Sequence, residues 1–188
     1  AVGAIGFGGL FSVYSYVSPI LTEYTHASIQ VIPFALACIG LVLVIGGLVE
    51  GHFADKNLNK AIIWVLVSNA CSYVRCALSM DHLATAFIAL FLVSFSIAGL
   101  GPLLQTRLMD VAGNAQGLAA SLNHSAFNIA NAFGAFLGGW LISQGFGWLA
   151  PIWVGVLLSL GGLMILLLAF QHEKKSISAC KSDANQTR

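Results

Sequence analysis

Polar residues that could do chemistry gather in one apolar stretch of this 188-residue chain, around residues 118–142. They recur at three- and four-residue steps, so a helix would place them on one face. This face comprises Gly117, Ser121, His124, Asn128, Asn131 and Ala135. The asparagines have two open interpretations: hydrogen bonding between helices, and lining of a substrate path. Histidine side chains can exchange protons near neutral pH, so His124 could also act as a proton carrier.

Two further groups of polar residues stand beside prolines in other apolar stretches. Tyr14, Ser15 and Ser18 precede Pro19, and Gln105 follows Pro102. A proline removes a backbone donor and can kink a helix. The two prolines lie at similar depths in their stretches, which fits broken helices at matching positions of an inverted repeat. Coincidence is the alternative, because prolines are common near helix ends.

The third candidate is the charged segment 51–60. Gly51 is expected to end the preceding helix in a tight turn, and Asp55 would sit at a membrane surface close to Lys56 and Lys60. Cys38, Cys71, Cys76 and Cys180 have no metal or redox spacing, so we expect neither a metal nor a cofactor.

Composition determines which elements must position these residues. The chain is 58% hydrophobic and 8% charged, whereas soluble domains carry roughly 25% charged residues. So few charges cannot cover a water-soluble fold. A net charge of +1 also provides no basic face for nucleic acid. The chain is therefore expected to partner a lipid bilayer.

Six apolar runs are each about long enough to cross a bilayer as a helix of roughly 20 residues. They span 1–22, 31–49, 61–79, 83–104, 118–142 and 150–170. Runs 61–79 and 150–170 carry few polar residues, and the last is expected to face lipid. A small-residue stripe in the fifth run, Ala126, Ala130, Gly134 and Gly138, predicts close helix packing.

Lysine and arginine predict the orientation of these helices. They occur in segment 51–60, at Arg107 and in the tail 172–188, while the remaining loops hold none. The positive-inside rule then places both chain ends in the cytoplasm. Arg75 lies near the other side, within snorkelling reach of the interface.

The segment 51–60 resembles the signature loop of the major facilitator superfamily. That loop runs glycine, three residues, aspartate, then arginine or lysine with more basic residues after it. Gly51, Asp55, Lys56 and Lys60 match, while Leu58 replaces a usual glycine. Segments 11–22, 101–107 and 121–135 are similar to the seventh, tenth and eleventh helices of the bacterial drug–proton antiporter and sugar-efflux branch.

The resemblance implies an all-α membrane protein of six transmembrane helices, equivalent to the C-terminal half of such a transporter. Residues 1–171 would form the bundle, and 172–188 a disordered cytoplasmic tail. The implied function is efflux of drugs, sugars or other small molecules by alternating access across a bacterial inner membrane. The implied partners are a small-molecule substrate, a coupling proton and an N-terminal six-helix half missing upstream of Ala1.

The resemblance also assigns roles to the candidate residues. Cavity-lining residues would be Tyr14, Ser15, Ser18, Gln105, His124, Asn128 and Asn131. Cytoplasmic gate residues would be Gly51, Asp55, Lys56 and Arg107.

Enzymes and channels fit less well. An intramembrane protease would need a glycine-flanked nucleophilic serine, and a voltage-gated channel regularly spaced arginines; the sequence has neither. A non-transporting remnant or membrane interaction protein would keep the same motifs and stays an alternative.

Overall fold

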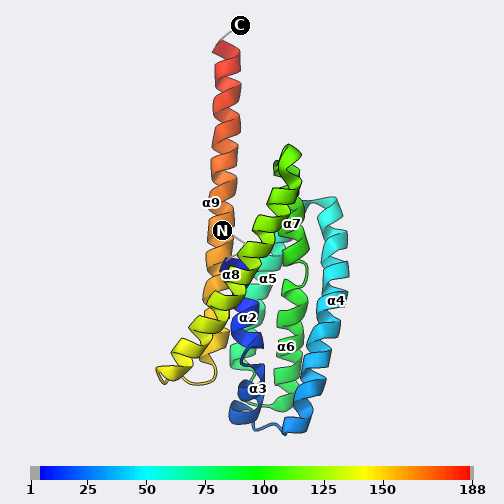
Figure 1. Ribbon diagram of the computed structural model, residues 1–188, viewed down its shortest axis with the longest axis vertical. Coiled ribbons are helices and arrows are strands. Elements are labelled where there is room, and N and C mark those ends of the chain that lie inside the picture. The colour runs from blue at the N-terminus through cyan, green and yellow to red at the C-terminus, as the bar shows by residue number, and fades with distance from the viewer. Residues whose placement is uncertain (1–4, 187–188) are drawn as a thin grey trace.

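The computed structural model describes residues 5–186, with side chains described to residue 171. The described residues form helices and no strand (Figure 1). The chain begins with the short helices α2 (Gly8–Tyr14) and α3 (Val17–Pro19), a π-helix (Ile20–Tyr24) and a 3₁₀ turn (Ile29–Val31). The long elements are α4 (Ile32–Lys56), α5 (Leu58–Leu78), α6 (Leu83–Ile97), α7 (Leu100–Val111), α8 (Gln116–Ser143) and α9 (Ala150–Gln186), with a 3₁₀ turn (Gly113–Ala115) before α8.

Among the described residues, five helical segments are long and apolar enough to cross a bilayer: Ile29–Lys56, Leu58–Leu78, Leu83–Val111, Gly113–Ser143 and Ala150–Gln171. Their outer faces expose large apolar side chains such as Phe34, Leu48 and Leu157. Contiguous apolar surface of this kind is stable in lipid and rare on soluble monomers. The chain is therefore an all-α integral membrane protein.

The first apolar run, predicted as a spanning helix over 1–22 with a proline kink, is divided into short helices; residues 1–4 lie outside the described part. It breaks at Ser15 and Tyr16, where the Tyr16 amide bonds the Val13 carbonyl at 3.0 Å in a tighter turn. Proline clashes with the carbonyl four residues earlier, which for Pro19 is that of Ser15. The kink predicted at Pro19 is therefore confirmed. The first run does not form one unbroken spanning helix.

The fourth run shows the same relation between break and proline. Ala98 and Gly99 separate α6 from α7, and Pro102 lies in the first turn of α7. Ala98 again stands four residues before the proline. A proline in the first turn of a helix removes no intrahelical hydrogen bond, because the amides there have no acceptor within their own helix. The two breaks thus occupy matching positions relative to their prolines.

The small-residue stripe of α8 makes a close helix contact, as predicted, and its partner is α2. A Cβ atom on Gly134 would overlap the backbone carbonyl of Gly8, and one on Gly138 would lie 2.9 Å from the Tyr16 ring. Two helices approach this closely only where side chains are absent. The predicted packing role of the stripe is confirmed.

A buried polar network joins α5, α6 and α9. The Asn69 amide donates to the Ser96 hydroxyl at 3.1 Å, and the Ser159 hydroxyl donates to the Asn69 carbonyl oxygen at 2.7 Å. All three side chains are buried. The expectation that the last run simply faces lipid is wrong for this side of α9, because Ser159, the only hydroxyl in residues 150–170, donates to Asn69.

The three segments rich in lysine and arginine lie at one end of the bundle. The α4–α5 turn, the C-terminal end of α7 and the C-terminal end of α9 share the upper end in Figure 1. The α9 backbone continues as a helix to Gln186, past the predicted boundary at residue 171. No break in the helix marks that boundary, and the division into bundle and disordered tail stays a prediction.

The α2–α8 contact yields a first test. Gly134→Ala should destabilise the bundle by about 1–3 kcal/mol, the usual cost of overpacking a tight contact. Thermal unfolding in detergent micelles would measure it. Gly117→Ala is the matched control on α8, since a Cβ there meets nothing within 4 Å. Equal unfolding temperatures for both variants would contradict the close contact.

Candidate functional site

A cavity of about 530 Å³ lies between the α6–α7 segment, α8 and the start of the first run. Its lining residues are Phe7, Ala98, Gly101, Pro102, Gln105, Thr106, Met109, His124 and Phe127. The cavity therefore touches the break that precedes Pro102. It brings together Gln105 and His124, two of the residues that the sequence predicted to share a cavity.

Gln105 is fixed from α8 by a residue that the sequence analysis missed. The Asn123 amide donates to the Gln105 side-chain oxygen at 3.5 Å, and Asn123 is buried. Asn123 stands beside the predicted polar face of α8 and does not belong to it. Asn123 thus bonds between α7 and α8, while both interpretations of Asn128 and Asn131 stay open.

The predicted polar face of α8 is uncovered in the described chain. Ser121, His124, Asn128 and Asn131 are all exposed, while Asn123, Ala130 and Gly134 on other sides of the helix are buried. Exposed amides and an imidazole are costly against lipid, because hydrocarbon satisfies none of their hydrogen bonds. This face must meet water or another protein surface.

The candidates of the first run lie elsewhere. Tyr14 and Ser15 are exposed, Ser18 is half-buried, and none of the three lines the 530 Å³ cavity. Tyr16, which the sequence analysis passed over, is the residue that bonds α8: its hydroxyl donates to the Ala135 carbonyl at 2.8 Å. The break places Tyr16 on the α8 side, a direction that an unbroken helix would not reveal.

The 51–60 segment differs from its predicted form. Gly51 does not end the helix, because α4 continues to Lys56 and stops at Asn57, whose side chain accepts from the Lys60 amide at 3.0 Å. Asn57 caps the N-terminus of α5, a role for which asparagine is well suited. The turn is therefore shorter and later than glycine suggested.

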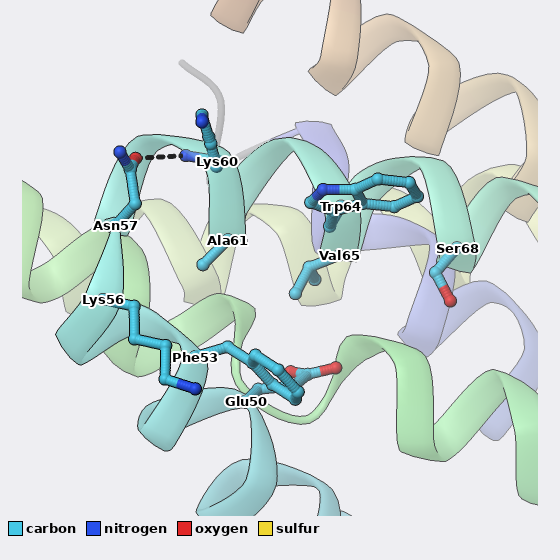
Figure 2. A pocket seen from close by; sticks show the side chains of 9 residues that line it. All are labelled: Glu50, Phe53, Lys56, Asn57, Lys60, Ala61, Trp64, Val65 and Ser68. Atoms are coloured by element: carbon cyan, nitrogen blue, oxygen red, sulfur yellow. Dashed lines mark hydrogen bonds between the residues drawn. The ribbon is translucent and has the colours of Figure 1, made fainter.

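A second cavity of about 460 Å³ opens between α4 and α5 at this turn (Figure 2). It is lined by Glu50, Phe53, Lys56, Asn57, Lys60, Ala61, Trp64, Val65 and Ser68. Of the gate candidates, only Lys56 lines it; Asp55 is exposed, and Arg107 lies on α7 with its guanidinium 5.1 Å from the centre of the Phe170 ring. The described geometry does not gather the four gate candidates into one cluster.

Glu50 is the most unusual residue here, and the sequence analysis gave it no role. It is 9% exposed, and its carboxylate accepts a hydrogen bond from the backbone amide of Gly99. Its partner is a backbone group at a helix break, so no side-chain pattern could have indicated it. The only sequence signal was a carboxylate next to an apolar run.

The opposite end of the bundle is closed by hydrogen bonds from the first run. The Tyr24 hydroxyl donates to the Asp81 carboxylate at 3.1 Å, and the Thr25 hydroxyl donates to the Met80 carbonyl at 2.9 Å. The hydrogen bond with Asp81 raises the pKa of Tyr24 above its usual range. These contacts tie the broken segment to the loop that joins α5 to α6.

Comparisons with known proteins agree with this architecture. The model of the Major Facilitator Superfamily matches residues 1–185. The chain is 31% identical over 183 residues to the inner membrane transport protein YdhP of Escherichia coli K12, covering 96% of this chain and 46% of that protein.

Two further relatives show the same partial coverage. The chain is 31% identical to the MFS-type transporter YfhI of Bacillus subtilis, over 94% of this chain and 45% of that protein. It is 30% identical to a probable sugar efflux transporter of Helicobacter acinonychis, over 88% of this chain and 41% of that protein. The chain thus spans about half the length of the relatives it matches.

The Tyr16 contact yields the second test. Tyr16→Phe should weaken the attachment of α8 by about 0.6 kcal/mol, and by no more than about 1.7, the range found for hydrogen bonds between helices in membranes. Thermal unfolding in micelles measures the change. Tyr14→Phe, two residues away on the exposed side, is the control and should leave stability unchanged. An equal loss in both variants would contradict the assignment.

Proposed function

This chain belongs to the major facilitator superfamily, and from that premise we propose that it acts as the C-terminal six-helix half of a solute transporter. The observation that carries the proposal is the uncovered polar face of α8 beside the 530 Å³ cavity. In transporters built from repeats, the substrate site lies between two halves that rock against each other. One half of such a protein must therefore present a polar face to the other half, because the two faces together form the substrate site.

The broken first segment counts as the sixth spanning element in this proposal. Residues 5–24 run alongside α8 and α9, packing glycines against both: Gly8 on α8 and Gly9 on Gly155 of α9. Broken helices are tolerated at membrane depth only where protein or a water-filled cavity satisfies the freed backbone groups. Both breaks in this chain meet that condition if a second half completes the cavity.

The proposed transport is efflux of a small molecule, driven by proton exchange. The relative from Helicobacter acinonychis is a probable sugar efflux transporter by name, which supports a sugar or similar polar solute as one candidate class. His124 lines the cavity, and histidine is the residue type that most often carries protons in proteins, so His124 is the candidate proton carrier. Gln105 would contact the substrate from the opposite side of the cavity.

Asn128 and Asn131 extend the same face along α8, and Tyr14, Ser15 and Ser18 would contribute where the second half approaches. Gly51, Asp55, Lys56 and Arg107 form the proposed gate at the end of the bundle that carries the basic segments. By the positive-inside rule this end faces the cytoplasm of a bacterial inner membrane. Both ends of the chain would then be cytoplasmic.

The proposal predicts that transport requires two halves. The chain should be expressed alone, and together with the N-terminal half of YdhP, in cells loaded with radiolabelled lactose or ethidium. Efflux is expected only from the pair, because the polar face of α8 is satisfied only there. Efflux by the unpartnered chain would contradict the half-transporter proposal. Stable pairing without efflux of any probe would favour a non-transporting interaction protein.

The gate assignment is tested by Asp55→Asn in the paired protein. Efflux should fall by about tenfold, equivalent to about 1.4 kcal/mol on the switching equilibrium, while the amount of protein in the membrane stays unchanged. Asp110→Asn is the control, because Asp110 is also an exposed acid close to the same end of the bundle. Normal efflux by the Asp55 variant would show that Asp55 has no role in the gate and is only a solvated charge.

A further inference from the structure

The Glu50 carboxylate has no part in the proposed cavity or gate, yet it is one of the most costly groups in the bundle. It lies six residues before Lys56, the last residue of α4, on a spanning helix, and only 9% of the residue is exposed. Ionisable side chains inside membranes are rare, almost always have a partner, and mark functional positions. The hydrogen-bond partner of Glu50 indicates what its carboxylate does.

That partner is the amide of Gly99, the residue that precedes α7. The first amides of a helix have no acceptor within it, and the helix dipole favours a negative charge there. Figure 2 shows the Glu50 carboxylate extending toward the green ribbon of the α6–α7 segment, away from the Lys56 ammonium group. The side chain therefore caps a helix that the break would otherwise leave uncapped.

The backbones around this contact fit each other closely. One turn before Glu50, a Cβ on Gly46 would lie 2.8 Å from both the Ala98 Cβ and the Phe95 carbonyl oxygen. A Cβ on Gly99 would overlap the Glu50 side chain itself. Two glycines, one on each side, thus allow α4 to reach the break.

The contact joins two parts of the proposed machinery. Beyond Glu50, α4 carries Gly51, Asp55 and Lys56, and beyond Gly99, α7 carries Gln105 and Arg107. We propose that Glu50 is a positioning residue that locks the gate-bearing end of α4 to the cavity-lining helix α7, so that both move as one unit. Its meaning for transport rests on the proposed function, whereas the lock itself is a property of this chain.

Hydrogen exchange of the residue-99 amide tests the lock without any substrate. The full chain, labelled at glycine with nitrogen-15 and placed in lipid nanodiscs, is followed by NMR. Glu50→Leu, which keeps the volume and removes the acceptor, should speed exchange by about tenfold or more, since hydrogen bonds to charged groups are among the strongest. Glu50→Gln keeps a side-chain oxygen acceptor and should restore most of the protection.

Two further variants complete the design. Gly99→Ala, followed with nitrogen-15 alanine, displaces the carboxylate without altering Glu50 and should also speed exchange, so the test survives if the Leu variant does not fold. Asp110→Asn controls for charge and should exchange as the unaltered chain does. Efflux by the paired protein should fall in the Leu and Ala variants and recover in the Gln variant.

The outcomes separate the two proposals. Unchanged exchange in the Leu and Ala variants overturns the lock, as does a Gln variant that exchanges as fast as the Leu variant. Reduced efflux with unchanged exchange also overturns it, because Glu50 would then act on the substrate and not on helix position. Faster exchange in a protein that shows no efflux in any form supports the lock and contradicts the transport proposal.

Discussion

The requirement that lipid places on backbone hydrogen bonds governs this structure more than any other interaction. Hydrocarbon accepts no hydrogen bond, so every amide and carbonyl freed by a helix break must find a partner within the protein. Two breaks in the described helices come shortly before prolines, one before Pro19 and one before Pro102. At the second break Glu50 accepts from the Gly99 amide, and at the first the Tyr16 amide bonds the Val13 carbonyl in a tighter turn.

Close packing follows from the same constraint. Lipid tails are as apolar as leucine, so helices in a membrane associate through tight contact and hydrogen bonds, not through the hydrophobic effect. The chain meets this need with glycines where α2 touches α8 and α9, and with the Asn69–Ser96–Ser159 network where α5, α6 and α9 meet. What these contacts leave uncovered is one polar face of α8.

The sequence predicted features that depend on local pattern. Apolar length indicated the spanning helices, four-residue spacing of small residues indicated that α8 packs closely against another helix, and Pro19 and Pro102 indicated the breaks. It did not predict features that depend on which neighbouring helix contacts a residue in the folded chain. In the sequence alone, Glu50 is a charge near a helix end, and its role becomes visible only when α6–α7 lies beside it. Ser159 is a single hydroxyl in an apolar run, and Tyr16 is a neighbour of the candidate Tyr14. In each case the partner is distant in sequence, and for Glu50 and Tyr16 it is a main-chain atom that any residue could supply.

The same reasoning explains why the candidate residues of the sequence divide into two groups. Gln105 and His124 meet at one cavity because α7 and α8 pack directly. Tyr14, Asn128 and Asn131 stay exposed because no described helix covers them. A polar group that costs free energy in lipid persists on a helix only where it has a partner or water. In the half-transporter that we propose, these uncovered residues are the surface at which the second half docks.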